Sequence, residues 1–460
     1  MAIIADSNTR HFGSGHEDCM GHAFGARLGM YASELNPGAG VGGWGYDTNN
    51  TTSYQWNPPF LMTTQALPAD LQSIFSQTDQ FPTAPAVLPN GAQAVYYYNA
   101  GFLVDASSLM DITGRLRYHL SHWIYADGSQ GSLNYVIRDA SSSSPYSTVY
   151  ASATWSTAGP KEGVQDLTLD VPASPSRTTL GILACPTNSA EGLPATGPAC
   201  LIWQRFENLD HATGVSYSPL WYGGGMSAWN VNVSLDVPQN ISGLTEWFRQ
   251  ITMAQNGPPV LLIHIIHGQN DMTHPEPSLG PVGGLDSSTP AGQKDNTLGI
   301  INKIRAAWVA SGRDQGNLFF LLGPYHPLPA PNQQMLLPEF EQGWRDIAAA
   351  DPQVFTLAGS MLSTAEEFAA RNFLYDGVNG IEPAHLSTLG YQTWAQTTVS
   401  AIDRALCPGD FNQDGRVTLT DIFDFLTAWF AHAKTADFNY NGQLDVLDIF
   451  DFLAAWFSKC

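Results

Sequence analysis

A serine lies just beyond the first predicted strand of the sequence. Ala2–Ala5 is a short apolar stretch typical of a buried strand, Ser7 follows it after one residue, and a helix is predicted over Glu17–Ser33. A serine on a tight turn between a strand and a helix exposes its hydroxyl at the carboxyl end of a sheet, where sites of α/β proteins form. Such a serine can be the nucleophile of acyl transfer. Its alternative role is to cap the helix.

Two further segments offer groups that can stabilise an oxyanion. The apolar stretch Val260–His267 predicts a buried strand, and Asn270 and Asp271 follow it. An asparagine there can donate its amide N–H to a developing negative charge, whereas its alternative role is an Asx turn. Gly225 ends a run of three glycines, where the backbone N–H stays accessible to a substrate. A flexible turn is the alternative for that run.

A histidine with nearby carboxylates supplies a candidate general base. His385 stands at the start of a helix predicted over His385–Ala405, and Glu382 precedes it by three positions. A carboxylate at that spacing can hold the imidazole in the tautomer that accepts a serine proton. Asp376 is the second candidate for this acid. A structural role near a helix start is the alternative for the histidine.

In the order Ser7, Gly225, Asn270 and His385, the sequence resembles the SGNH (GDSL-type) hydrolase family. The resemblance covers the predicted α/β part of the chain. It implies that Ser7 is the nucleophile and that His385 is its general base. It also implies an oxyanion hole formed by the backbone N–H groups of Ser7 and Gly225 and the side chain of Asn270.

The sequence departs from the family pattern at three places. Ala5 replaces the usual glycine before Asp-Ser, and Glu382 occupies the position normally held by aspartate. Asp376 begins an Asp-Gly-Val that often runs straight into the histidine in this family, so Asn379–Ala384 is an insertion here. Glu382 is favoured as the acid of the triad, and Asp376 remains the alternative.

The resemblance implies a carboxylic ester hydrolase that works without a metal. Some carbohydrate-active esterases of this family carry an inserted sandwich, which favours ester groups on a polysaccharide, acetyl groups above all, as the substrate. An esterase or lipase acting on small or lipid esters is one alternative. A catalytically inactive carbohydrate-binding or scaffold-associated protein is another.

The C-terminal segment contains an internal repeat, because Asp421–Phe430 recurs as Asp448–Phe457 with one substitution. Before each copy, oxygen-bearing side chains occupy positions 1, 3, 5, 9 and 12 of a loop, with glycine at position 6. This is the pattern of a calcium loop, in which position 7 contributes its carbonyl. The predicted Ca²⁺ ligands are Asp410, Asn412, Asp414, Arg416, Thr418 and Asp421, followed by Asp437, Asn439, Asn441, Gln443, Asp445 and Asp448. A turn that caps a helix is the alternative for a single loop, but two loops in register favour calcium.

Residues 407–460 resemble a type I dockerin. The resemblance implies a pair of half EF-hands that docks a secreted enzyme onto a cohesin-like scaffold protein. Positions 10 and 11 of the loops, often polar in that family, are Leu419 and Thr420 in the first loop and Val446 and Leu447 in the second. Packing of this segment against the rest of the chain is therefore the alternative to docking.

The candidate catalytic residues need a parallel sheet to position them. Apolar strands predicted at Ala2–Ala5, Val260–His267 and Asn317–Gly323 alternate with helices predicted at Asn296–Ser311 and His385–Ala405. Alternation of strands and helices indicates a parallel sheet covered by helices. The sequence therefore predicts an α/β fold.

A different pattern separates the two halves of this α/β part. Short runs with period two, such as Leu116/Tyr118/Leu120, favour an antiparallel β-sandwich. We therefore predict a three-layer α/β/α SGNH-like fold with a parallel sheet, interrupted by a sandwich and followed by a small helical EF-hand-like module. The predicted parts are the first α/β segment at 1–96, a jelly-roll-like sandwich at 97–209, the second α/β segment at 210–405 and the dockerin-like module at 406–460.

The composition and the cysteine positions limit which classes of partner and which cellular compartment fit this sequence. The formal net charge of −22, from 19 basic and 41 acidic residues, argues against nucleic acid as a partner. No apolar run is long enough to predict a membrane span. Cys185 and Cys200 flank a loop and Cys407 and Cys460 bracket the C-terminal segment, which favours two disulfides and a secreted, extracellular protein. The role of Cys19 stays open.

Histidines elsewhere favour structural roles. His11, His16, Cys19 and His22 cluster near the candidate nucleophile, but their spacing matches no recognised zinc motif. His264 and His267 lie three residues apart on one predicted strand and therefore point to opposite faces of the sheet. The pair cannot hold a metal together.

Overall fold

The computed structural model describes the chain in segments. Two compact units, Met1–Gln392 and Thr393–Cys460, are each described by themselves. The described residues are 2–5, 30–35, 60–61, 86–87, 93–97, 100–105, 113–124, 132–139, 148–156, 163–177, 179–186, 199–210, 215–221, 241, 244–245, 248–249, 260–266, 271, 289–323, 337–357, 365–377, 380–412, 416–438 and 443–458. No helix among them is long and apolar enough to cross a membrane.

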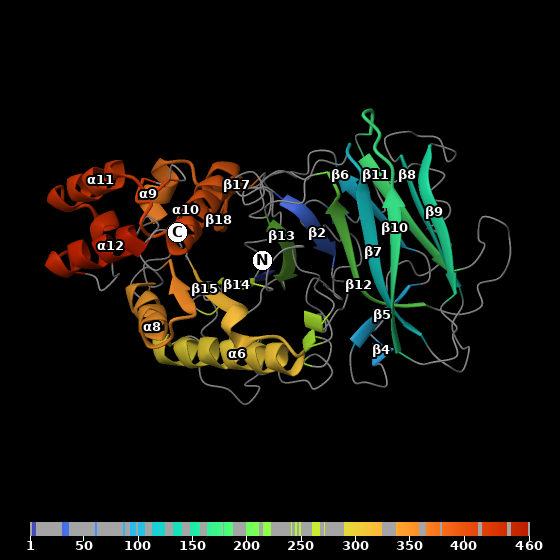
Figure 1. The fold of residues 1–460 in the computed structure, drawn as a ribbon, viewed down its shortest axis with the longest axis horizontal. Helices are drawn as coiled ribbons and strands as arrows, with labels where there is room; N and C mark the ends of the chain where they lie inside the picture. Colours follow the sequence, from blue (N-terminus) through green and yellow to red (C-terminus); the bar gives the residue numbers. More distant parts are fainter. Residues whose placement is uncertain are drawn as a thin grey trace. The chain divides into compact units, whose positions relative to one another are not determined.

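The first unit is built on a mixed sheet that includes a run of parallel strands (Figure 1). Neighbouring strands in this run follow the order β2-β13-β1-β14-β15-β16. Their bounds are β1 Ala2–Ala5, β2 Met30–Leu35, β13 Val215–Trp221, β14 Leu261–Ile266, β15 Leu318–Leu322 and β16 Val354–Thr356. The predicted strands at Ala2–Ala5, Val260–His267 and Asn317–Gly323 are confirmed, and the chain is a mixed α/β protein.

Successive parallel strands are placed first on one side of β1 and then on the other, so the order in which the sheet is built reverses at β1. From β1 the chain adds β13 on one side, and it then adds β14, β15 and β16 in turn on the other side. In open α/β sheets such a reversal leaves a crevice at the carboxyl ends of the two strands that flank it, here β1 and β14. The topology therefore selects this edge of the sheet as the place for a site.

One predicted helix conflicts with the sheet. A helix was predicted over Glu17–Ser33, but Met30–Leu35 forms strand β2, which pairs in parallel with β13 and antiparallel with β12 (Ala199–Asn208). The prediction is wrong for its last four residues, and residues 17–29 lie outside the described part of the chain. Pairing with two strands that are distant in sequence overrides the local helical pattern.

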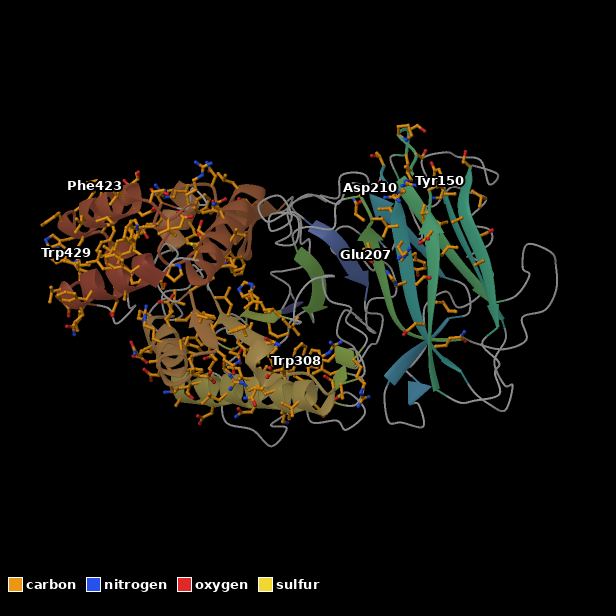
Figure 2. The ribbon with its side chains drawn as sticks, viewed as in Figure 1. Tyr150, Glu207, Asp210, Trp308, Phe423 and Trp429 are labelled. Carbon is orange, nitrogen blue, oxygen red and sulfur yellow. The ribbon has the colours of Figure 1, made fainter. Side chains whose placement is uncertain are left out.

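Helix α6 (Pro290–Ala310) lies along the sheet and begins earlier than the predicted Asn296–Ser311. Thr289 caps it, since its hydroxyl accepts the Gly292 N–H at 3.1 Å, and a proline in the first turn lacks an N–H that would need a partner. Trp308, marked in Figure 2, is buried on its inner face. Other helical elements of this region are η4 Gln315–Asn317, α8 Leu337–Ala350 and α9 Ala365–Ala370.

The helices α6 and α8 pack on each other and on β15. Lys294 of α6 pairs with Asp346 of α8 at 2.7 Å, and the Arg305 guanidinium lies 5.3 Å from the centroid of the Phe320 ring of β15. The buried Trp344 of α8 lies against Gly323, directly after β15. These contacts join one helical layer to the parallel sheet.

The middle of the chain adds antiparallel strands to the large sheet and forms a second, antiparallel sheet. Strands β10-β7-β12 continue the large sheet, and β3-β6-β11-β8-β9 form a separate sheet. Their bounds are β3 Phe60–Leu61, β4 Ala86–Val87, β5 Gln93–Tyr97, β6 Ala100–Asp105, β7 Leu116–Ile124, β8 Ser132–Asp139, β9 Val149–Ser156, β10 Gly163–Val171 and β11 Thr179–Pro186. Buried Tyr118 and Ile137 come one from each sheet. Strands β2 to β5 bring residues before position 97 into these two sheets, and the predicted domain boundaries stay predictions.

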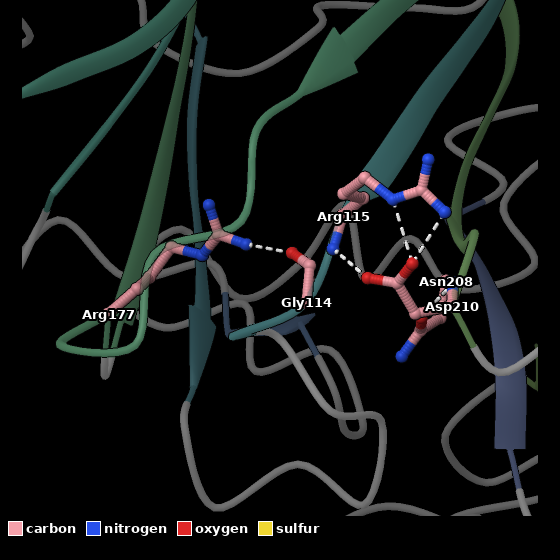
Figure 3. Close-up of polar contacts among 5 residues, drawn as sticks. All are labelled: Gly114, Arg115, Arg177, Asn208 and Asp210. Atoms are coloured by element: carbon pink, nitrogen blue, oxygen red, sulfur yellow. Dashed lines mark hydrogen bonds and ion pairs between the residues drawn. The ribbon is translucent and has the colours of Figure 1, made fainter.

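A polar cluster ties one end of this region together (Figure 3). The Arg177 side chain is 1% exposed and donates hydrogen bonds to the carbonyl oxygens of Pro172 at 2.9 Å and Gly114 at 2.6 Å. The Asp210 carboxylate accepts the backbone N–H of Arg115 at 2.8 Å and its Nε–H at 2.7 Å. Buried cations are tolerated when such acceptors satisfy them. The cluster thereby fixes where β7 begins and where β12 ends.

The second unit contains two helices that carry the sequence repeat. These are α11 (Leu419–Phe430) and α12 (Val446–Ser458), and the short helix η5 (Lys434–Ala436) lies between them in the chain. Helix α10 (Thr388–Leu406) precedes α11. Phe425 and Phe452, at equivalent positions of the repeat, are fully buried, and their rings stack with centroids 4.3 Å apart. Cys407 is disulfide-bonded, and its predicted partner Cys460 lies outside the described residues. The repeat therefore folds around one aromatic core.

Candidate functional site

Three neighbouring strands of the parallel sheet end at the same level. Ala5, the last residue of β1, is the register partner of Trp221, the last residue of β13. It is also the register partner of Ile266, the last residue of β14. Because the three strands run parallel, the segments that leave them start side by side at one edge of the sheet, the edge selected by the strand order.

The candidate nucleophile and both candidate oxyanion donors follow these three strand ends. Ser7 comes two residues after Ala5, Gly225 four residues after β13, and Asn270 four residues after β14. Ser7, Gly225 and Asn270 themselves lie outside the described residues. What the structure brings together is therefore the three strand ends that precede them.

A buried carboxylate follows the last of these positions. Asp271 is 0% exposed and has a helical conformation. Taking an ionised carboxylate out of water is costly unless donors satisfy it. Asp271, the residue after Asn270 in the sequence, is therefore held in the protein interior.

A histidine inside the sheet fixes the neighbouring strand end. His264 of β14 is fully buried, and its Nε2–H donates to the carbonyl oxygen of Gly323, while the Gly323 N–H donates to the carbonyl oxygen of Ile265 at 3.0 Å. Burial lowers the pKa of His264 from 6.5 to about 4, and the hydrogen bond to Gly323 opposes this shift only in part. The imidazole is therefore neutral at physiological pH and serves as a structural donor.

The candidate base and acids lie on a hairpin. Strand β17 (Leu374–Gly377) pairs antiparallel with β18 (Gly380–Leu386), so Asp376, Glu382 and His385 belong to one two-stranded sheet. The predicted start of a helix at His385 is wrong, because α10 begins at Thr388. Within the predicted insertion Asn379–Ala384, residues 380–384 belong to the second strand, and Asn379 lies outside the described residues.

The hairpin is irregular where the candidate residues lie. Leu374 pairs with Leu386 and Asp376 pairs with Ile381, so the four residues from Glu382 to His385 face a single residue of β17. A bulge of this kind redirects side chains and is common next to functional sites. Among the described residues, the pairing of this hairpin is confined to its own two strands. The choice between Asp376 and Glu382 stays open.

The residues after the hairpin are held to the segment that precedes it. Ser387 donates its backbone N–H to the carbonyl oxygen of Phe373 at 2.7 Å and its hydroxyl to that of Asn372 at 2.5 Å. The Ser387 hydroxyl oxygen also accepts the Gly390 N–H at 3.2 Å, which caps α10. Sequence analysis missed this cap, although a serine before an apolar helix is its usual signal.

In both calcium loops predicted in the second unit, the carboxylate at position 12 accepts the backbone N–H of position 9 and one N–H from the start of its loop. Asp421 accepts the backbone N–H groups of Asn412 at 3.1 Å and Thr418 at 2.7 Å. In the second loop Asp448 accepts those of Phe438 at 2.8 Å and Asp445 at 2.9 Å. Each carboxylate is therefore turned toward the backbone of its own loop.

Burial agrees with the oxygen pattern of these loops. Asp421 and Asp448 are 0% exposed, and Asp410, at position 1 of the first loop, is 5% exposed. Ca²⁺ takes carboxylate, amide and carbonyl oxygens, so this donor set fits that ion. Asp414, Asn439 and Asn441 lie outside the described residues, and the residues that are described contain no group of three or more His, Cys, Asp or Glu able to hold a metal.

Comparison with known proteins gives no sequence relative. No protein-family model matches the chain, and no curated protein matches it. Among solved structures, it is similar to a family two carbohydrate esterase from Cellvibrio japonicus, with 8% identity, a TM-score of 0.24, and coverage of 71% of this chain and 94% of that chain.

Two other solved structures show likenesses of the same order. A family two carbohydrate esterase from Clostridium thermocellum in complex with cellohexaose has 9% identity, a TM-score of 0.29, and coverage of 71% of this chain and 98% of that one. An arabinose-bound α-L-arabinofuranosidase has 12% identity, a TM-score of 0.32, and coverage of 77% and 58%. At such TM-scores a likeness does not establish a common fold, so the functional conclusion has to come from the site.

Proposed function

We propose that this protein is a secreted serine esterase that removes ester groups, acetyl groups above all, from a polysaccharide. The observation that supports it best is the common ending of β13, β1 and β14, with Trp221, Ala5 and Ile266 in register. Each strand leads within four residues to one group that acyl transfer requires: a hydroxyl, a backbone N–H and a side-chain amide. A finer fold description, a three-layer SGNH-like domain with an inserted jelly-roll-like sandwich, belongs to the same proposal.

In the proposed reaction, the Ser7 hydroxyl attacks the ester carbonyl carbon while His385 accepts the hydroxyl proton. The carbonyl π electrons move to the oxygen, whose negative charge is held by the N–H groups of Ser7, Gly225 and Asn270. The C–O bond to the alcohol then breaks, and the protonated His385 gives the alcohol its proton. Water, deprotonated by the same histidine, attacks the acyl-enzyme and releases the acid with Ser7 restored.

The acid that orients His385 is assigned to Glu382, with Asp376 as the alternative. Both belong to the irregular hairpin that also carries the histidine, and Glu382 lies in the bulged stretch. A carboxylate beside the imidazole stabilises the imidazolium that forms during attack. Because a bulge alters side-chain direction, it can accommodate the longer side chain of a glutamate at the position where the family usually has an aspartate.

We test the esterase with acetate release from an acetylated polysaccharide, measured beside a soluble aryl acetate. The Ser7→Ala variant should lose activity on both, whereas Ser458→Ala, on the last turn of α12, is the matched control and should keep it. Release from the aryl ester alone keeps the mechanism and moves the substrate to small or lipid esters. Full activity of Ser7→Ala, or no activity on either ester, counts against the proposal, and the latter favours an inactive carbohydrate-binding protein.

We further propose that residues 406–460 bind structural Ca²⁺ and dock the enzyme onto a cohesin-like scaffold protein. The proposed ligands are the twelve loop residues identified from the sequence, and the buried carboxylates of Asp410, Asp421 and Asp448 support them. Bound calcium would neutralise these carboxylates and order the loops. The disulfide at Cys407 supports an oxidising, extracellular compartment.

Thermal melting with and without a calcium chelator tests this second proposal. Calcium should raise the melting temperature of the C-terminal unit, because it binds the folded loops only. Asp410→Asn, which keeps the side-chain shape and removes the charge, should reduce that rise. A melting curve that calcium leaves unchanged rejects the loop assignment.

A further inference from the structure

Strands β10, β7 and β12 carry charged residues on the side of the sheet that faces away from the core. Tyr118 of β7 is buried, so its neighbours Arg117 and His119 lie on the opposite side of the strand. The register places Asp170 of β10 on one side of Arg117 and Glu207 of β12 on the other. The exposed Thr168 of β10 is the register partner of His119. The polar face is the surface formed by Arg117, His119, Thr168, Asp170 and Glu207.

Ion pairs cross from strand to strand on the polar face. Arg117 donates from Nε to Asp170 Oδ1 at 2.6 Å and from Nη2 to Asp170 Oδ2 at 3.2 Å. This hydrogen bonding holds the pKa of Asp170 below its usual value, so the carboxylate is ionised at neutral pH. On the other side of β7, the His119 Nε2 lies 2.9 Å from the Glu207 carboxylate, which Figure 2 labels. The charged side chains therefore hold one another in place.

Stability alone does not account for this row of charged side chains. The Arg117 and Asp170 side chains are 37% and 65% exposed. A further pair at the start of β7, Arg115 with Asp210, is 61% and 33% exposed (Figure 3). Ion pairs as exposed as these contribute little to stability, because water screens the charges. What the pairs do provide is a set of ordered hydrogen-bond donors and acceptors that solvent can reach.

The chemistry of the polar face indicates which class of ligand it fits. Both of its carboxylates are paired with basic side chains, so the face offers no excess of positive charge to a polyanion. Its described side chains are all polar, whereas the centre of a protein–protein interface is depleted of charged residues. A neutral polymer rich in hydroxyl groups fits better, because a hydroxyl can donate to a carboxylate and accept from a guanidinium.

We propose that the polar face is a second contact surface for the polysaccharide substrate, built on strands other than those that lead to the catalytic groups. Sugar hydroxyls would bond to Arg117, Asp170 and Thr168 and keep the polymer on the enzyme between cleavage events. Because the charged side chains are already fixed by their own pairs, they lose little conformational freedom when a ligand binds. This inference rests on the proposed function in one respect, that the substrate is a polysaccharide.

The test is native affinity electrophoresis of the full chain carrying Ser7→Ala, in gels that contain acetylated xylan, deacetylated xylan or hydroxyethyl cellulose. The net charge of −22 carries the protein through the gel, and the substitution prevents turnover. We expect at least one polymer to retard the protein. Adding Arg117→Ala together with Asp170→Ala removes the pair without leaving an unpaired charge. It should weaken binding about tenfold, since the loss of one hydrogen bond to a charged group has an effect of that order.

A second variant and a matched control separate binding from folding. Thr168→Val keeps the branched shape of the side chain and removes only the hydroxyl, so it should weaken binding about fivefold, the effect of one neutral hydrogen bond. The control is Lys294→Ala with Asp346→Ala, which removes an ion pair of 2.7 Å whose side chains are 33% and 45% exposed. It should leave the retardation unchanged. Circular dichroism and thermal melting check that each variant is folded, and Thr168→Val tests the face by itself if the double variant is not.

The outcomes separate this inference from the esterase proposal. Retardation by none of the three polymers overturns the polar face as a sugar-binding surface. Folded face variants that bind as tightly as the control do the same, whatever the esterase assay shows. Acetate release is measured separately on protein with Ser7 intact. A protein that binds through the polar face but releases no acetate counts against the esterase and supports the binding surface.

Discussion

The buried His264 should make the stability of the α/β unit depend on pH in a predictable direction. The unfolded chain takes up a proton on this histidine below about pH 6.5, its unperturbed value. Burial keeps the folded form neutral until about pH 4. Between these values the unfolded state binds more protons, so the free energy of unfolding falls as the pH falls. The contribution is complete above about pH 6.5 and is lost progressively down to about pH 4.

The size of the effect follows from the same two values. Each pH unit between them is worth about 1.4 kcal/mol. A pKa of about 4 in place of 6.5 therefore predicts a loss of about 3 kcal/mol over the whole window, of which about 2 kcal/mol falls between pH 7 and pH 4.5. A typical domain is stabilised by roughly 5 to 15 kcal/mol, so such a loss is a large part of its free energy of unfolding.

The assay is equilibrium urea denaturation at several pH values for the unaltered protein and for His264→Gln. The glutamine amide can donate to Gly323 O as the imidazole Nε2–H does, but it does not titrate in this range. Both proteins share every other titrating group, so the difference between their curves isolates His264. Curves that run parallel from pH 7 to pH 4.5 would refute the reasoning. A titration of the imidazole resonance, with a midpoint near 6.5, would refute it directly and needs no variant.

Three further predictions concern single side chains. Gly323→Ala should lower the unfolding free energy of the α/β unit by about 3 kcal/mol, because Gly323 has φ +80° and a Cβ would lie 2.5 Å from the Trp344 ring. An unchanged melting temperature would contradict this. Glu382→Ala should reduce kcat for ester hydrolysis by more than Asp376→Ala, by about 10²- to 10⁴-fold, and the reverse order in the same assay would assign the acid to Asp376. Phe452→Ala should cost the C-terminal unit about 3 to 5 kcal/mol, since the ring is fully buried, and calcium-saturated melting that is unaffected would argue against the shared aromatic core.

The strands of the parallel sheet were predictable because their sequence pattern is local. Val260–His267 and Asn317–Gly323 are continuous apolar stretches, and β14 and β15 fall within one residue of the predicted bounds. Fully buried strands need apolar side chains on both faces. The equivalence of α11 and α12 was predictable for a related reason, because two segments with nearly the same sequence favour the same local structure.

The hairpin that carries His385 was not predictable in the same way. Its strands depend on pairing between Leu374 and Leu386 and on a bulge that places four residues opposite one. The residues Glu382 to His385 contain a proline and no period-two pattern, so they read as an approach to the helix that follows. A pairing partner, which local propensity does not reveal, decides between strand and helix here.

His264 shows a similar limit on its own strand. Spacing alone placed it and His267 on opposite faces of the sheet, which excluded a shared metal. The bond to Gly323 could not be predicted, because it depends on β15 lying beside β14 in one register. Because β15 lies beside β14, the buried His264 can donate the hydrogen bond that fixes the end of β15.

The sequence by itself determined the residue types of the candidate site, the apolar strands and the oxygen pattern of the two C-terminal loops. These features are written in short stretches of chain, where side-chain size, polarity and spacing act directly. Only the tertiary structure decided that β13, β1 and β14 end at one level and that charged side chains of β10, β7 and β12 pair on one face. The physical reason is that sheet register and core packing depend on contacts between residues far apart in the chain, whose energies no local pattern contains.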